Sequence, residues 1–149
     1  MRAIARNLAI VAIVAAAAAV PGLADTHSDV LELFASMTSA LSDDNPAGFM
    51  KAFDRNMPDY DKLSGYVDGL IREAEVSASI DPTKDEGDDV KRAVELDWTL
   101  QIRSRQMAGP LVERQQTVHV ELVKQKKHWR IVSFTPIDLF APAKFSLSK

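Results

Sequence analysis

The sequence predicts an α+β domain in which three N-terminal helices pack on one face of a curved, mainly antiparallel four-stranded sheet. Two observations lead to this fold class. Apolar residues recur at helical spacing as far as about Ala74, and from Glu75 to Phe134 they alternate with polar residues as in half-buried strands. The alternating runs meet at Met107–Pro110 and at the basic turn Lys124–Lys127, which indicates consecutive antiparallel strands.

The first 24 residues have the pattern of a secretory signal peptide. Two arginines precede the apolar run Leu8–Val20, which is shorter than a membrane-spanning helix and ends at Pro21. Gly22 and Ala24 place small residues at positions −3 and −1 of a cleavage site. We therefore expect cleavage after Ala24 and a periplasmic or secreted protein, with an uncleaved N-terminal anchor as the alternative.

The remainder, about 125 residues, suits a single domain at residues 25–142, followed by a flexible tail at residues 143–149. The chain has no cysteine, so an exported domain must depend on its core. Cleavage would remove two arginines and no acid, which changes the net charge from −3 to −5. A mildly acidic protein lacks the electrostatic basis for binding nucleic acid or an anionic membrane surface.

Three helices are expected before the sheet. Thr26–Leu41 carries one apolar stripe, and Asn45-Pro46 starts a short second helix with an N-cap followed by proline. Asp59–Ala74 is the third, and its buried stripe comprises Leu63, Val67, Leu70 and Ile71. Gly65 and Gly69 lie on one face of it and predict close backbone packing or a bend.

The expected sheet begins with a strand at Glu75–Asp81, after which the acidic segment Asp81–Asp89 is a turn. The next strand directs five apolar residues to the core: Val94, Leu96, Trp98, Leu100 and Ile102. A turn centred near Ala108 would pair Leu96 with Val118 or Val120, so that the apolar faces coincide. The last strand places Trp129 and Ile131 in the core, and Val132 and Phe134 on the opposite face.

Two segments resemble the nuclear transport factor 2-like superfamily, to which the SnoaL-like proteins belong. Asp43–Phe53 is similar to the second-helix segment of that superfamily, and His128–Phe134 is similar to its closing strand, where a Trp-Arg-Ile-Val run is frequent. The resemblance implies a bent sheet that wraps a long helix into a cone with a pocket at its open end. Some members are isomerases, hydrolases or dehydratases, and many are non-catalytic binding or assembly domains.

A pocket of this kind would be lined by seven residues: Phe53, Tyr60, Tyr66, Trp98, Arg114, Gln116 and Trp129. Arg114 and Gln116 share the apolar face of their strand and could form a polar floor, or they could lie where the strand runs past the core. Trp98 and Trp129 could stack on a ligand or simply fill the core.

Three titratable side chains are weak catalytic candidates. Asp54 as a base and Tyr60 as a hydrogen-bond donor would suit proton abstraction beside a carbonyl, or else they are a surface residue and a rim aromatic. His119 should face Glu95 or Asp97 across the sheet, as a general base would require. The alternation, however, places that pair on the polar face, where a solvated pair is expected.

The remaining charged segments predict no further site. The acids of residues 81–89 do not have calcium-loop spacing, and the basic turn at residues 124–128 lacks interleaved aromatic residues for base stacking. The sequence contains no phosphate-binding loop, nucleophile elbow, dinucleotide fingerprint or metal-ligand spacing. We therefore expect no cofactor and no metal.

These observations favour a non-catalytic domain that binds a small apolar ligand or a protein partner. One alternative is an isomerase- or hydrolase-type enzyme that uses Asp54 and Tyr60, or His119. The other is an assembly domain that forms a homodimer through Val132 and Phe134 on the outer face of the sheet.

Overall fold

The computed structural model describes residues 21–106 and 111–143 of the 149-residue chain. Three helices come first, α2 (Pro21–Ser42), α3 (Pro46–Met50) and α4 (Tyr60–Glu73). Four strands and a short 3-10 helix follow: β1 (Ala74–Gly87), β2 (Lys91–Ser104), β3 (Leu111–Gln125), β4 (His128–Thr135) and η2 (Asp138–Phe140). This order confirms the predicted α+β class.

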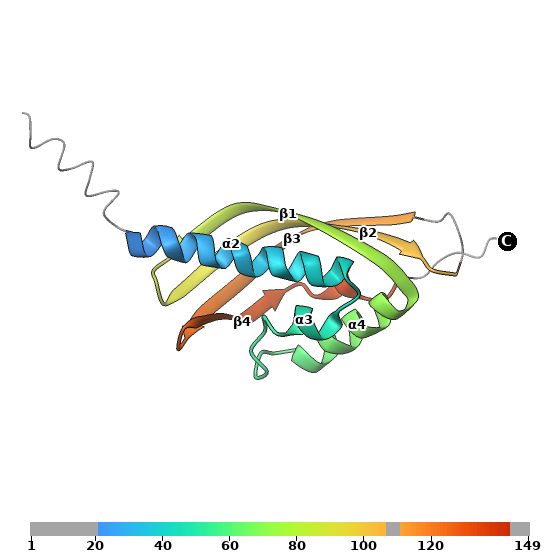
Figure 1. Ribbon diagram of the computed structural model, residues 1–149, viewed down its shortest axis with the longest axis horizontal. Coiled ribbons are helices and arrows are strands. Elements are labelled where there is room, and N and C mark those ends of the chain that lie inside the picture. The colour runs from blue at the N-terminus through green and yellow to red at the C-terminus, as the bar shows by residue number, and fades with distance from the viewer. Residues whose placement is uncertain (1–20, 107–110, 144–149) are drawn as a thin grey trace, which may run out of the picture.

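The strands form one open antiparallel sheet in the order β1-β2-β3-β4. The sheet bends over the long helix α2, and α3 and α4 lie beneath the β4 side (Figure 1). Register agrees with the sequence pattern, since Leu96 pairs with Val118 and Glu95 pairs with His119. All five apolar residues predicted to face inward from β2 are buried, because antiparallel pairing keeps the two apolar faces on the same side.

The helices form as their local signals predict. The side chain of Asn45 accepts a hydrogen bond from the backbone of Gly48 at 2.9 Å, and Pro46 begins α3. The four residues of the predicted stripe on α4 are all buried. Close packing occurs at Gly69 alone, where an added Cβ would lie 3.3 Å from the Pro142 side chain, whereas Gly65 has open space beside it.

The first strand is longer than predicted. The segment Asp81–Gly87, expected to belong to a turn, continues β1 and pairs with β2 as far as Gly87 with Arg92. A register shift between Pro82 and Lys84 lets the strand pass the proline. Charged side chains are normal on an exposed edge strand, and for this reason the segment resembles a turn in sequence. At Gly87 φ is +134°, and a Cβ would lie 2.2 Å from the Lys91 carbonyl oxygen, so the tight connection requires glycine.

The predicted outward position of Phe134 is wrong. The register of β3 and β4 shifts so that Glu121 pairs with Ser133 but Leu122 pairs with Ile131, which leaves Val132 as an extra residue. Such a bulge reverses the alternation of the residues that follow it. Phe134 is therefore 2% exposed and belongs to the core, so it contributes nothing to an outer-face interface.

The interior is filled by an aromatic cluster around Trp98. Its ring makes edge-to-face contacts with four phenylalanine rings at centroid distances between 5.5 and 6.5 Å, contributed by Phe34, Phe49, Phe134 and Phe140. The last of these comes from η2, so the C-terminal segment completes the core. The sheet and helices thus enclose packed side chains at the place where the resemblance implies a pocket.

The structure describes only part of the N-terminal segment in which a signal peptide is expected. Helix α2 begins at Pro21, earlier than the predicted start at Thr26, and the expected cleavage position after Ala24 falls within it. Residues 1–20 and most of the predicted tail, residues 144–149, lie outside the described residues. Among the helices that the structure describes, none is long and apolar enough to cross a membrane.

Candidate functional site

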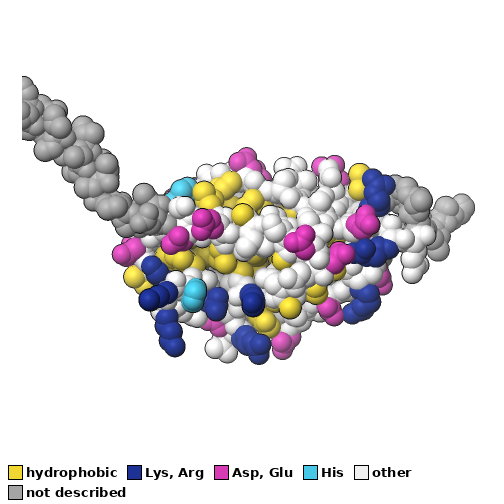
Figure 2. All heavy atoms as spheres, in the orientation of Figure 1, with side chains coloured by type: hydrophobic (Ala, Val, Ile, Leu, Met, Phe, Trp, Pro, Cys, Tyr) yellow, Lys and Arg dark blue, Asp and Glu magenta, His cyan; other side chains and the backbone are white. Residues whose placement is uncertain are grey.

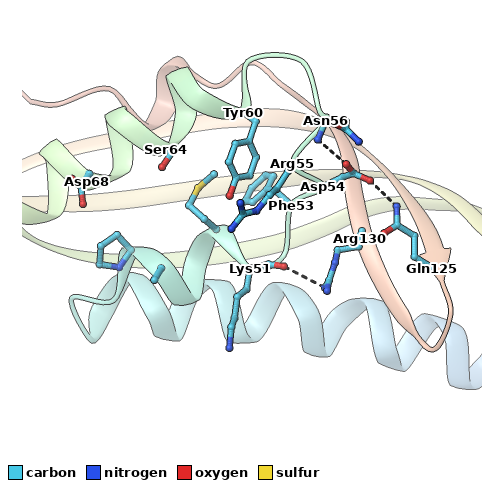
Figure 3. A pocket seen from close by; sticks show the side chains of 13 residues that line it. Lys51, Phe53, Asp54, Arg55, Asn56, Tyr60, Ser64, Asp68, Gln125 and Arg130 are labelled. Carbon is cyan, nitrogen blue, oxygen red and sulfur yellow. Dashed lines mark hydrogen bonds between the residues drawn. The ribbon is translucent and has the colours of Figure 1, made fainter.

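A hollow of about 900 Å³ lies between α3, the start of α4 and the β3–β4 turn (Figure 3). Its lining mixes polar and apolar side chains, and of the apolar ones Phe53 and Met50 are buried while Tyr60 is half-buried. The hollow is also lined by residues with polar side chains: Lys51, Asp54, Arg55, Tyr60, Gln125 and Arg130.

The connection between α3 and α4 positions the hollow because it pairs with β4. The backbone N–H of Asp54 donates to the Ile131 carbonyl at 2.8 Å, and the N–H of Ile131 donates to the Ala52 carbonyl at 2.8 Å. A parallel bridge between Phe53 and Ile131 results. The connection therefore covers part of the free edge of β4, and it carries Asp54 and Arg55, which both line the hollow.

Asp54 has the properties of a structural carboxylate. Its Oδ1 accepts a hydrogen bond from the Asn56 N–H at 2.7 Å, and its Oδ2 accepts one from the Gln125 side chain at 2.6 Å. These hydrogen bonds, the one from Asn56 first, hold the pKa of Asp54 below its ordinary value, and the Arg130 charge adds to the effect. The carboxylate is directed toward Asn56 and Gln125 and away from Tyr60 (Figure 3). It is consequently a poor proton acceptor near neutral pH.

The hollow also collects cations. Arg130 is half-buried and donates to the Lys51 carbonyl at 3.3 Å, and Arg55 is exposed beside Phe53. Within the described part of the chain, Lys51, Arg55 and Arg130 form no salt bridge. Three other arginines do pair with carboxylates: Arg72, Arg92 and Arg105. Sequence reasoning missed this set because Lys51 and Arg55 come from the α3–α4 connection and Arg130 comes from β4.

The structure places the predicted pocket residues in several different environments. Phe53 and Tyr60 line the hollow. Trp98 and Trp129 are buried in the core, and Gln116 is exposed. Tyr66 is half-buried on α4 with the Lys62 ammonium 5.6 Å from its ring centroid, outside the hollow.

Arg114 is occupied in holding the C-terminal segment. It shares the inner face of the sheet, and its Nη1 donates to the carbonyl oxygens of Leu139 and Ala141, both at 2.6 Å. Burial lowers the pKa of Arg114, although an arginine stays charged at neutral pH. Its guanidinium therefore binds the C-terminal segment at the position where the sequence pattern predicted a polar pocket floor.

His119 lies on the outer face of the sheet. Its Nδ1 is 3.3 Å from Oε2 of Glu95, and its side chain is 61% exposed. An exposed pair of this kind contributes little to stability, and a water-accessible surface does not favour its use as a base.

The acidic segment supplies a buried ion pair that the sequence pattern did not predict. Arg92, 8% exposed, donates from Nε to Asp85 at 2.7 Å and from Nη1 to the Asp88 carbonyl at 3.0 Å. His27 of α2 also contacts Asp85, so this cluster ties the start of α2 to the sheet. Over residues 21–106 and 111–143, no group of three or more His, Cys, Asp or Glu side chains is arranged to hold a metal ion.

No protein-family model matches the sequence, and no curated protein matches it significantly. Solved structures do match. A nuclear transport factor 2-like superfamily protein from Salmonella enterica has a TM-score of 0.62 at 13% identity, covering 85% of this chain and 98% of that one. A scytalone dehydratase candidate from Novosphingobium aromaticivorans has a TM-score of 0.69 at 11% identity, covering 77% and 85%.

A third match is a nuclear transport factor 2-like protein of unknown function from Shewanella oneidensis, with a TM-score of 0.56 at 9% identity, covering 72% of this chain and 95% of that one. Identities this low establish shared architecture and leave function to be argued from the site. The chain has the nuclear transport factor 2-like fold, which confirms the structural part of the resemblance seen in Asp43–Phe53 and His128–Phe134.

Proposed function

We propose that the protein is an exported domain that binds a small, largely apolar ligand in the hollow beside Phe53 and Tyr60 and does not catalyse a reaction. The supporting observation is that the interior is packed around Trp98, while the hollow of about 900 Å³ has both apolar and polar side chains in its lining. Ligand sites usually have volumes of about 300–1,000 Å³ and this mixture of surfaces. The signal-like N-terminus supports export.

The arrangement of titratable groups argues against catalysis. An isomerase or hydrolase of the kind first considered would need Asp54 directed at a substrate held by Tyr60. Instead, both carboxylate oxygens of Asp54 accept hydrogen bonds from Asn56 and Gln125, and these hydrogen bonds lower its pKa. His119, the other candidate, is on the solvated outer face.

A fluorescence titration of the mature chain, residues 25–149, with phenylnaphthylamine tests the proposal. This neutral, apolar probe should bind at the hollow. Tyr60→Ala should weaken binding at least about fivefold because an aromatic contact is lost from the site. Tyr66→Ala is the matched control, because it removes a half-buried tyrosine from the same helix outside the hollow, and it should leave the affinity unchanged.

Two outcomes would contradict the proposal. One is no saturable binding of the probe to the folded protein, as verified by circular dichroism. The other is an equal effect of Tyr60→Ala and Tyr66→Ala, which would place the binding site elsewhere.

A further inference from the structure

Three cationic side chains line the hollow together with two acidic ones, Asp54 and Asp68. The whole chain carries a net charge of −3, yet Lys51, Arg55 and Arg130 meet at one site. Asp54 partly balances Arg130, since that charge contributes to the lowered pKa of Asp54. Arg55 is left without a hydrogen bond or an ion pair among the described residues.

The acids of the hollow are already engaged. Both oxygens of Asp54 accept hydrogen bonds, and Asp68 pairs with Arg72 at 3.0 Å. A guanidinium that has no carboxylate partner of its own is the group that proteins most often use to bind a carboxylate, sulfonate or phosphate from outside, because its planar fork matches the oxygen geometry.

Hydrogen-bond donors and apolar surface lie together at this point. Phe53, Arg55 and Tyr60 all line the hollow, and their side chains overlap in the view of Figure 3. The Tyr60 hydroxyl, like the Arg55 guanidinium, has no hydrogen bond within the part of the chain that the structure describes. An anionic head group could accept from both, while an aromatic or aliphatic body contacted the half-buried Tyr60 ring and the few exposed atoms of Phe53 and Met50.

The neighbouring turn would attract such a ligand. Exposed Lys126 and Lys127 follow Gln125, which itself lines the hollow, and dark-blue side chains gather at the β3–β4 end of the molecule (Figure 2). Local positive potential raises the rate at which anions arrive, and salt weakens the effect.

We propose that the ligand of this hollow is a small amphipathic anion whose carboxylate-type head is bound by Arg55, with Tyr60 and Arg130 as secondary donors. The inference rests on the proposed function, since it names the chemical class of the ligand that the same hollow binds. It adds a specificity that apolar contact alone does not supply.

Two probes with the same ring system separate this inference from the proposed function. Phenylnaphthylamine is neutral, and anilinonaphthalene sulfonate adds one negative charge. The mature protein should bind the sulfonate about tenfold more tightly than the neutral probe, as expected for a charge-assisted hydrogen bond. Raising the salt concentration should weaken binding of the sulfonate and leave that of the neutral probe unchanged or stronger.

Arg55→Gln should lower the affinity for the sulfonate about tenfold and leave the neutral probe within about twofold. Arg55→Lys should retain part of the preference, because it keeps the charge and loses the fork. Arg103→Gln is the matched control. It makes the same change at an exposed arginine of β2 outside the hollow, and it should alter neither affinity.

Three other results would contradict the anion inference or both proposals. Equal affinity of the wild-type protein for the two probes, or an equal loss for both in Arg55→Gln, overturns the anion inference and leaves the proposed function standing. An equal loss of sulfonate binding in Arg103→Gln also overturns it, because general charge would then explain the preference. If neither probe binds, both proposals fail.

Discussion

Trp98 is the central residue of the buried aromatic cluster. Its indole is 0% exposed and touches phenylalanine rings from α2, α3, β4 and η2. Edge-to-face contacts of this kind contribute beyond the area that they bury. Because these rings surround its indole, Trp98 is a core residue.

Replacing Trp98 should therefore be costly. Trp98→Ala is expected to lower the free energy of unfolding by about 3–5 kcal/mol, as large core truncations do, measured by urea denaturation. His119→Ala serves as a contrast on the neighbouring strand and should stay within about 0.5 kcal/mol, because that side chain is 61% exposed. A loss below about 1 kcal/mol for Trp98→Ala would contradict the packed interior.

At the scale of elements, two irregular segments complete the regular ones. The α3–α4 connection covers the edge of β4 through the Phe53–Ile131 bridge. The η2 segment closes the end of the sheet, where Arg114 binds two of its carbonyl oxygens and Phe140 enters the core. Both segments are held by contacts with residues far away in the sequence. Neither has a periodic sequence pattern from which its position could be predicted.

Loss of the Arg114 contacts should loosen the C-terminal segment. Arg114→Met keeps an apolar stem but leaves two carbonyl oxygens without their donor, and it should cost about 1.5–3 kcal/mol, the usual range for hydrogen bonds to charged groups. Hydrogen exchange should rise at the amides of Phe140 and Ala141 and remain slow in β2. Gln116→Met, on the same strand face but exposed, is the control. Unchanged protection at Phe140 would show that apolar packing alone holds the segment.

The sequence predicted most regular elements and few of the contacts between them. The helix stripes, the inward face of β2 and the pairing of Leu96 with Val118 follow from local periodicity. Phe134 was misplaced because the bulge at Val132 has no signal in an apolar run. The length of β1 was missed because the charged residues of an edge strand resemble those of a turn.

On the scale of the whole molecule, charge is distributed unevenly. The chain is acidic overall, whereas the hollow and the adjoining β3–β4 turn carry cations, and the buried pair of Arg92 with Asp85 lies at the opposite end of β2 from the Arg105–Asp44 pair.

Export should give a chain that begins at Asp25. The signal-like pattern places cleavage after Ala24, within α2 as the structure describes it. In a bacterial host, intact-mass spectrometry of the periplasmic fraction should show the loss of residues 1–24. Ala24→Glu should block processing because a cleavage site requires a small residue at that position. Recovery of the full-length chain in the membrane fraction would instead support the N-terminal anchor.

The sequence by itself determined the fold class, the helix and strand faces and most of the register, because these depend on the backbone geometry of neighbouring residues. Only the tertiary structure decided where the hollow lies and which side chains line it. Asp54 meets Gln125 across 71 positions of sequence and Arg114 meets Ala141 across 27, and such contacts depend on how irregular connections and one bulge place distant segments. Close packing of the buried side chains then leaves the hollow at the surface, with an Arg55 that has no ion pair among the described residues.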